Sequence, residues 1–138
     1  MNKVFIDSNI WLYAFIDSLE KTKIAKKIIS KEPNIVLSVQ VINEVSFNLI
    51  KKLHFDEGEI RNLIEDFYSK YEIVNFNEKN LRLASNIRTL RQISYWDSLI
   101  IASALENDCS ILYSEDMQHN QIIENKLKIV NPFLYNTD

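Results

Sequence analysis

The sequence has almost no glycine. Gly58 is the single glycine among 138 residues, whereas average usage near 7% would give about ten. A Walker loop and a dinucleotide-binding fingerprint both require glycines where the backbone approaches a phosphate closely. The sequence therefore excludes a nucleotide cradle of either kind. With so little glycine, we expect asparagine, which tolerates left-handed backbone, to supply many of the turns.

Cysteine and long apolar runs are also scarce. Cys109 is the single cysteine, which excludes a disulfide within the chain and a cysteine metal cluster. No stretch approaches 18 uninterrupted apolar residues, and MNKVFIDSN lacks the apolar segment of a signal peptide. We therefore expect a soluble, cytoplasmic protein with no membrane partner, in which Cys109 packs as a small hydrophobe.

The net charge of −3 gives no basic excess. Taken alone, this argues against a nucleic-acid partner, because phosphate neutralisation supplies much of the affinity of such proteins. Bound cations are often the largest local charges in a site. Two divalent ions held by acidic residues would reverse the sign of the total, so the net charge does not decide the question.

Short apolar runs alternate with segments of helical periodicity. Strands are predicted over 3–7, 35–38, 72–75 and 110–113, with a possible fifth over 128–130. Capping residues mark three of the helices between them: Asp56 followed by Glu59, then Asn77, then Ser94. This order predicts an α/β fold, a three-layer α/β/α sandwich with a central parallel sheet of four to five strands. We expect a single domain over 1–138.

Four acidic residues fall where such a fold places its ligands, beyond the carboxyl ends of the strands. Asp7 ends the first strand and Asp116 follows the fourth. Glu44 lies on the helix after the second strand, and Asp97 lies in the first turn of an apolar helix. Converging carboxylates repel one another. A divalent cation such as Mg²⁺ or Mn²⁺ removes that repulsion, because both prefer carboxylate oxygens.

Each acid also has an ordinary structural interpretation. Asp7 is a good N-cap for the next helix, and Asp97 is a favourable acid for a first turn. Glu44 fits a solvated helix face, and Asp116 fits a turn. Composition and pattern leave the structural and the chemical interpretations both open.

The residues around these acids resemble a known family. VFIDSNIWLYAF, QVINEV and SYWDSLIIASALENDCSILYSEDMQHNQIIENKLKIVNPF are similar, in order and spacing, to the motifs of PIN-domain ribonucleases of the VapC toxin type. The resemblance covers essentially the whole chain. It departs at Asn120, where close relatives often carry glycine after the histidine.

The resemblance implies a PIN-like fold and a metal-dependent ribonuclease that cleaves single-stranded RNA with one or two Mg²⁺ or Mn²⁺ ions. It also implies the toxin of a type II toxin–antitoxin pair, with a cognate antitoxin as partner and often a homodimer. The acids that match the catalytic and metal-binding cluster are Asp7, Glu44, Asp97 and Asp116. Ser114 matches a supporting hydroxyl position, and Asn9 matches the polar residue after the first acid.

Basic residues near these motifs are candidates for contacting RNA. Arg88 and Arg91 precede the third acid, and His119 follows the fourth. Phosphate contact is one interpretation, and a solvated charged face or a polar loop is the other. Trp96, next to Asp97, is expected to lie largely in the core.

Two alternatives remain. A haloacid-dehalogenase-like phosphohydrolase also has an aspartate at the end of its first strand, but it needs a second acid where this chain has Asn9. A PIN fold retained only to bind RNA or protein would be catalytically silent. Loss of an acid would indicate that, and none is lost here.

Overall fold

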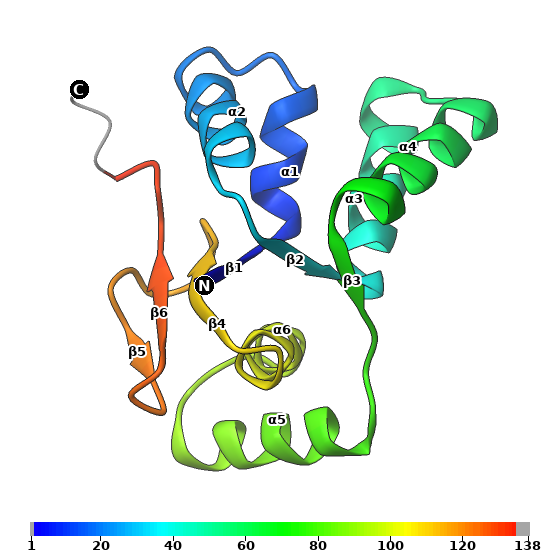
Figure 1. Ribbon diagram of the computed structural model, residues 1–138. Coiled ribbons are helices and arrows are strands. Elements are labelled where there is room, and N and C mark those ends of the chain that lie inside the picture. Colours follow the sequence, from blue (N-terminus) through cyan, green and yellow to red (C-terminus); the bar gives the residue numbers. More distant parts are fainter. Residues whose placement is uncertain (1, 135–138) are drawn as a thin grey trace.

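The computed structural model describes residues 2–134 (Figure 1). Helices and strands alternate along most of the chain. In order, they are β1 (Lys3–Ile6), α1 (Ser8–Phe15), α2 (Glu20–Lys31), β2 (Ile35–Ser38), α3 (Val39–Leu53), α4 (Glu57–Lys70), β3 (Glu72–Val74), α5 (Glu78–Leu90), α6 (Tyr95–Glu106), β4 (Cys109–Tyr113), β5 (Ile122–Ile123) and β6 (Leu127–Val130).

The six strands form one sheet in the order β3-β2-β1-β4-β6-β5. The first five of these are parallel to their neighbours, and β5 pairs antiparallel with β6. The prediction of four to five parallel strands is therefore confirmed. The sequence pattern did not predict β5, because two residues are too few to show a period.

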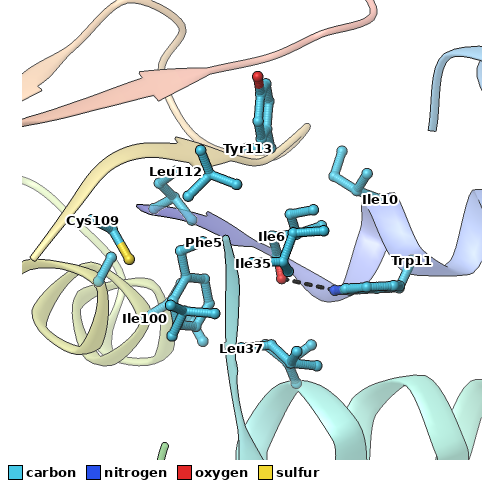
Figure 2. Close-up of a cluster of buried hydrophobic side chains, with 14 of the residues drawn as sticks. Phe5, Ile6, Ile10, Trp11, Ile35, Leu37, Ile100, Cys109, Leu112 and Tyr113 are labelled. Carbon is cyan, nitrogen blue, oxygen red and sulfur yellow. Dashed lines mark hydrogen bonds between the residues drawn. The ribbon is translucent and has the colours of Figure 1, made fainter. Parts of the chain in front are cut away.

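Helices cover both faces of this sheet. In Figure 1, α5 and α6 lie on one side, whereas α1 and α2 lie on the other. Figure 2 shows Phe5 of β1 directed toward Ile100 of α6, and Trp11 of α1 donating a hydrogen bond to the Ile6 carbonyl. That bond has an Nε1–O distance of 3.1 Å. The central strands β1 and β2 are almost fully buried because both faces are covered, and the predicted three-layer α/β/α sandwich is confirmed.

Side-chain caps begin the helices where the sequence predicts them. Asp56 and Glu59 form a complete capping box at α4, and Asn77 forms one with Asn80 at α5. The Ser94 hydroxyl accepts a hydrogen bond from the Asp97 amide and caps α6. These local signals were sufficient because a cap satisfies backbone N–H groups within one turn of its own residue.

The prediction for Trp96 is wrong. Its side chain is 62% exposed, and the continuous buried run of α6 begins only at Ser98. The apolar composition of α6 does not indicate which residues of its first turn lie beyond the covering elements. Cys109, in contrast, is buried as expected, and its buried thiol has a pKa raised to about 12.

Left-handed turns are made without glycine. Within residues 2–134, the positive-φ residues are Leu19, His54, Asp108, Asn120, Glu124 and Asn125. Asparagine therefore supplies only two of these positions, fewer than its abundance suggested. Asn120 is one of them, at φ 67°, a backbone conformation that asparagine tolerates better than most residues. The described chain contains no helix that is both long and apolar enough to cross a bilayer.

Candidate active site

The site begins where the two central strands end. Asp7 follows β1 and Ser114 follows β4, and these strands are parallel neighbours. The Ser114 hydroxyl donates to Asp7 Oδ2 at 2.9 Å, and the Asp7 amide donates to the Tyr113 carbonyl at 3.0 Å. The strand order reverses between β1 and β4, which is the position where open α/β sheets bind their ligands.

Asp7 serves as a helix cap as well as a site residue. It is the N-cap of α1, and its Oδ1 accepts a hydrogen bond from the Ser8 amide at 2.8 Å. Its side chain is only 6% exposed. The two interpretations of Asp7 are therefore compatible, since capping occupies one carboxylate oxygen and the Ser114 hydroxyl reaches the other.

Asp116 is held in place by the two residues predicted to support the acids. Its amide donates to the Ser114 hydroxyl at 3.3 Å, and its Oδ2 accepts from Asn9 Nδ2 at 3.0 Å. Asn9 Oδ1 in turn accepts from the Glu115 amide at 3.2 Å. Asn9 and Ser114 thus connect the loop after β4 to the beginning of α1.

The other two acids approach from helices. Glu44 lies in the second turn of α3, which is capped by Ser38, and Asp97 lies in the first turn of α6. Both are half-buried. Their carboxylates are near enough to Asp7 to raise its pKa, and Asp116 likewise raises the pKa of both Glu44 and Asp97. The fold therefore brings all four predicted acids into one electrostatic cluster.

Burial makes this cluster unfavourable while its members are ionised. Loss of hydration is the main reason that the pKa of Asp7 rises from 3.8 to about 7. The hydrogen bonds from Ser8 and Ser114 oppose that rise without cancelling it. Loss of hydration also raises the pKa of Glu44 and of Asp97. The site is thus suited to bind positive charge.

The described residues give the cluster no ion-pair partner. Within residues 2–134, the ion pairs are Lys3–Glu72, Lys21–Glu115, Lys79–Glu106 and Arg82–Glu78, and none includes any of the four acids. In the same part of the chain, no three His, Cys, Asp or Glu side chains form a ready-made metal cage. An oxygen-only donor set that leaves places for water fits Mg²⁺ or Mn²⁺, because such ions retain several waters.

Two pockets border the acids. The first, of about 440 Å³, is mostly polar and includes Asp97, Asp116 and Arg91 in its lining. The second, of about 480 Å³, is more apolar and includes Glu44 and Trp96. The acidic cluster therefore contributes to the walls of two chemically different spaces.

The predicted substrate-binding residues have different surroundings. Arg91 lines the first pocket. Arg88 donates from Nη1 to the Ser98 hydroxyl at 2.7 Å, and its guanidinium lies 4.3 Å from the centre of the Tyr95 ring. His119 Nδ1 accepts from the Asn131 amide at 2.9 Å. Arg88 thus links α5 to α6, whereas Arg91 is the arginine beside the acids.

Sequence reasoning missed a second group of residues beside Asp116. Glu115 accepts a hydrogen bond from the Tyr13 hydroxyl at 2.8 Å and forms an ion pair with Lys21. The Lys21 ammonium also lies over the rings of Tyr13 and Phe133. These residues come from α1, α2 and the two loops that follow β4 and β6, so no local pattern indicated their contact.

The comparisons with known proteins agree with this geometry. The family model described as "PIN domain" matches residues 4–124. The chain therefore belongs to the PIN domain family.

Its structural neighbours are toxins of the VapC and FitB kind. It is similar to a toxin–antitoxin complex from Klebsiella pneumoniae, with 20% identity, a TM-score of 0.70 and coverage of 94% of this chain and 97% of the other. It is also similar to VapC20 from Mycobacterium tuberculosis, a toxin that cleaves the sarcin–ricin loop, with 13% identity, a TM-score of 0.65 and coverage of 79% and 86%.

A third similar structure is VapBC2 from Rickettsia felis bound to a DNA fragment from its promoter. The identity is 20%, the TM-score is 0.63, and the alignment covers 94% of this chain and 99% of the other. A search of curated protein sequences gave no significant match. At these identities the structural likeness establishes the shared fold.

Proposed function

We propose that this protein is a metal-dependent endoribonuclease and the toxin of a type II toxin–antitoxin pair. One observation carries the proposal: four carboxylates from four separate segments of the chain meet at the carboxyl end of the sheet, and none of them forms an ion pair within residues 2–134. A cluster of this kind lowers stability unless it binds a cation. Membership of the PIN domain family and the fold shared with toxins support it.

Each acid has a role that follows from its position. Asp7, Asp97 and Asp116 would hold one or two Mg²⁺ or Mn²⁺ ions, either directly or through water. Glu44, which borders the second pocket, would ligate as well or orient the attacking water. Bound divalent ions would supply positive charge to the phosphodiester oxygens and make water a better nucleophile near neutral pH.

The remaining residues act on these four. Ser114 and Asn9 position Asp7 and Asp116 through the hydrogen bonds described above. Arg91 is placed to meet the phosphate backbone of an RNA strand in the first pocket. Arg88 holds α5 against α6, and His119 joins the loop after β4 to the residue that follows β6. Contact with RNA is a prediction for both.

The partners follow from the class of toxin. We propose an RNA substrate, a cognate antitoxin protein and a homodimer, with cytoplasmic action. Similar structures have been solved as toxin–antitoxin complexes, one of them on promoter DNA. Exposed apolar side chains on α3 and α4, among them Phe47 at 61% and Tyr68 at 54%, are available to protein partners.

The test is RNA cleavage with Mg²⁺ or Mn²⁺ by the wild type, Asp7→Asn and Asp97→Asn. We expect each substitution to lower the rate at least about a hundredfold, because even outer-sphere partners of a metal are worth 10–100-fold. Equal cleavage by all three proteins would sink the nuclease proposal. Growth arrest on expression, relieved by the product of a neighbouring gene, tests the toxin role, and normal growth contradicts it.

The two alternatives are less well supported. A haloacid-dehalogenase-like phosphohydrolase needs an acid at position 9, and Asn9 there donates a hydrogen bond to Asp116, so it offers no proton to a leaving group. A silent PIN-fold binding module would not need the four acids, all of which are present. The Asp7→Asn comparison separates this module from the enzyme.

A further inference from the structure

The second pocket has the composition of a nucleobase site. It measures about 480 Å³ and is lined by residues from α3, from the segment between β3 and α5, and from α6: Val39, Gln40, Asn43, Glu44, Asn75, Phe76 and Trp96. Because Glu44 is one of the four clustered acids, the pocket opens directly beside the place where cleavage is proposed.

Aromatic rings form part of its wall. Trp96 is 62% exposed although it sits next to the buried run of α6, and its ring contacts Tyr95 edge-on at a centroid distance of 5.3 Å. Phe76 is half-buried and packs against the core. An exposed indole held beside a catalytic acid is well suited to stacking, which is how proteins bind unpaired bases of single-stranded RNA.

Amide groups supply hydrogen bonds in the same space. Gln40, Asn43 and Asn75 each carry one acceptor and two donor hydrogens, of which Asn75 Oδ1 already accepts from the Phe76 amide at 2.9 Å. Gln40 Oε1 is buried and has no hydrogen-bond partner among the described residues. A buried acceptor without a partner is costly, and a rotation of the Gln40 amide toward the pocket would let the exocyclic amine of a base satisfy it. Amides of this kind read the edges of unpaired bases.

The charge of the lining favours a base over a phosphate. None of the lining residues is Lys, Arg or His, and Glu44 is the acid among them. A phosphate would be repelled there, whereas a neutral base would not. The first pocket has the complementary character, because Arg91 lines it together with Asp97 and Asp116. The two pockets thus separate the two chemical parts of a nucleotide.

We propose that the pocket of Trp96, Phe76, Gln40 and Asn75 binds one unpaired nucleobase of the RNA, adjacent to the phosphodiester that is cleaved. The base stacks on Trp96 and donates to Gln40 Oε1, and the backbone runs past the acids toward Arg91. This pocket selects the nucleotide at the cleavage point. The inference rests on the proposed ribonuclease function and adds a determinant of sequence preference to it.

Tryptophan fluorescence offers a direct test. The chain has two tryptophans, Trp11 and Trp96, and Trp11 is 3% exposed, so a stacking ligand quenches mainly Trp96. The probes are AMP, CMP, GMP and UMP, with ribose 5-phosphate as the base-free control, in EDTA. We expect saturable quenching by at least one nucleotide, none by ribose 5-phosphate, and none in Trp96→Phe. Equal quenching by ribose 5-phosphate, or quenching retained in Trp96→Phe, overturns the proposal.

Two more variants test the chemistry of the pocket. Gln40→Met keeps the length of the side chain but removes its amide. We expect the concentration of the preferred nucleotide that gives half-maximal quenching to rise about tenfold. In RNA cleavage, Trp96→Ala should raise KM about tenfold and leave kcat within about twofold, while Trp96→Phe stays near wild type. The matched control is Leu90→Ala, which removes a large exposed apolar side chain at the end of α5. A lower kcat with unchanged KM in Trp96→Ala contradicts the base site.

The same measurements separate failure of this site from failure of the enzyme. RNA cleavage by the wild type with an unchanged KM in Trp96→Ala keeps the nuclease and removes the base pocket. Saturable quenching without any cleavage keeps the pocket and removes the nuclease. A second copy of this chain is the competing occupant. If Trp96→Ala halves the mass measured by light scattering and nucleotides do not quench, the pocket is an interface and the proposal is overturned.

Discussion

The Ser114 hydroxyl joins two clustered acids that are 109 positions apart in the sequence. It donates to Asp7 Oδ2 at 2.9 Å and accepts from the Asp116 amide at 3.3 Å. Ser114 is fully buried. One small side chain therefore orders the carboxylate at the end of β1 and begins the loop that carries Asp116.

Replacing Ser114 by alanine tests this relationship. In Ser114→Ala, the pKa of Asp7 should rise further, because the hydrogen bond that lowers it is lost. We expect Mn²⁺ to bind about tenfold more weakly in calorimetric titration, and the free energy of unfolding to fall by about 1–3 kcal/mol. Ser110→Ala is the control, because its hydroxyl contacts the Lys3 carbonyl and not an acid. Equal Mn²⁺ affinity in both variants would contradict the role of Ser114.

The raised pKa of Asp7 predicts how stability depends on pH without metal. The folded protein binds this proton more tightly than the unfolded chain, with a pKa of about 7 against 3.8. The contribution of Asp7 to stability is therefore greatest below pH 4. It falls as the pH rises from about 4 to about 7, and it is lowest above pH 7. In EDTA at pH 8, Asp7→Asn should melt about 3 °C or more above wild type.

The same comparison has an internal control. At pH 5 the melting temperatures of wild type and Asp7→Asn should lie closer together, and added Mg²⁺ at pH 8 should stabilise the wild type more than the variant. Thermal melts monitored by circular dichroism give all of these values. A variant that is less stable than wild type at pH 8 in EDTA would show that the burial of this charge is compensated elsewhere.

Asn9 is predicted to matter for catalysis more than for stability. Its amide group donates to Asp116 at 3.0 Å and accepts from the Glu115 amide at 3.2 Å. Asn9→Ala releases both, so RNA cleavage should fall about tenfold while the melting temperature changes little. Asn86→Ala, on the exposed face of α5, should leave both unchanged. Wild-type cleavage by Asn9→Ala would mean that Asp116 is positioned by Ser114 alone.

The same substitution should change the stability at Trp11 and leave it nearly unchanged at Trp96. Trp11 Nε1 donates to the Ile6 carbonyl at 3.1 Å (Figure 2). The Trp11 ring also packs against Phe67, with a centroid distance of 5.0 Å. Trp11→Phe should lower the free energy of unfolding in urea by about 1–3 kcal/mol. Trp96→Phe, at an exposed position, should change it by less than about 0.5 kcal/mol. Similar urea midpoints for both variants would contradict the buried hydrogen bond.

The features predicted correctly from sequence are those with a local cause. Caps such as Asp56 and Ser94 act within one turn of their own helix. A carboxylate that follows an apolar strand has no position except the end of the sheet, and this rule correctly located Asp7 and Asp116. The exposure of Trp96 and the linkage of Arg88 to Ser98 depend on which elements pack over them, and helical periodicity carries no such information. The Glu115–Lys21–Tyr13 group joins segments about a hundred positions apart, so it became visible only in three dimensions.

The placement of β4 between β1 and β6 has a consequence for synthesis of the protein. Asp7 and Glu44 leave the ribosome early, but Asp97 and Asp116 come from the last third of the sequence, and β4 must insert beside β1 before Ser114 can meet Asp7. A partly translated chain therefore carries an incomplete set of acids. For an enzyme that would attack RNA, this order means that unfinished chains beside their own message are harmless.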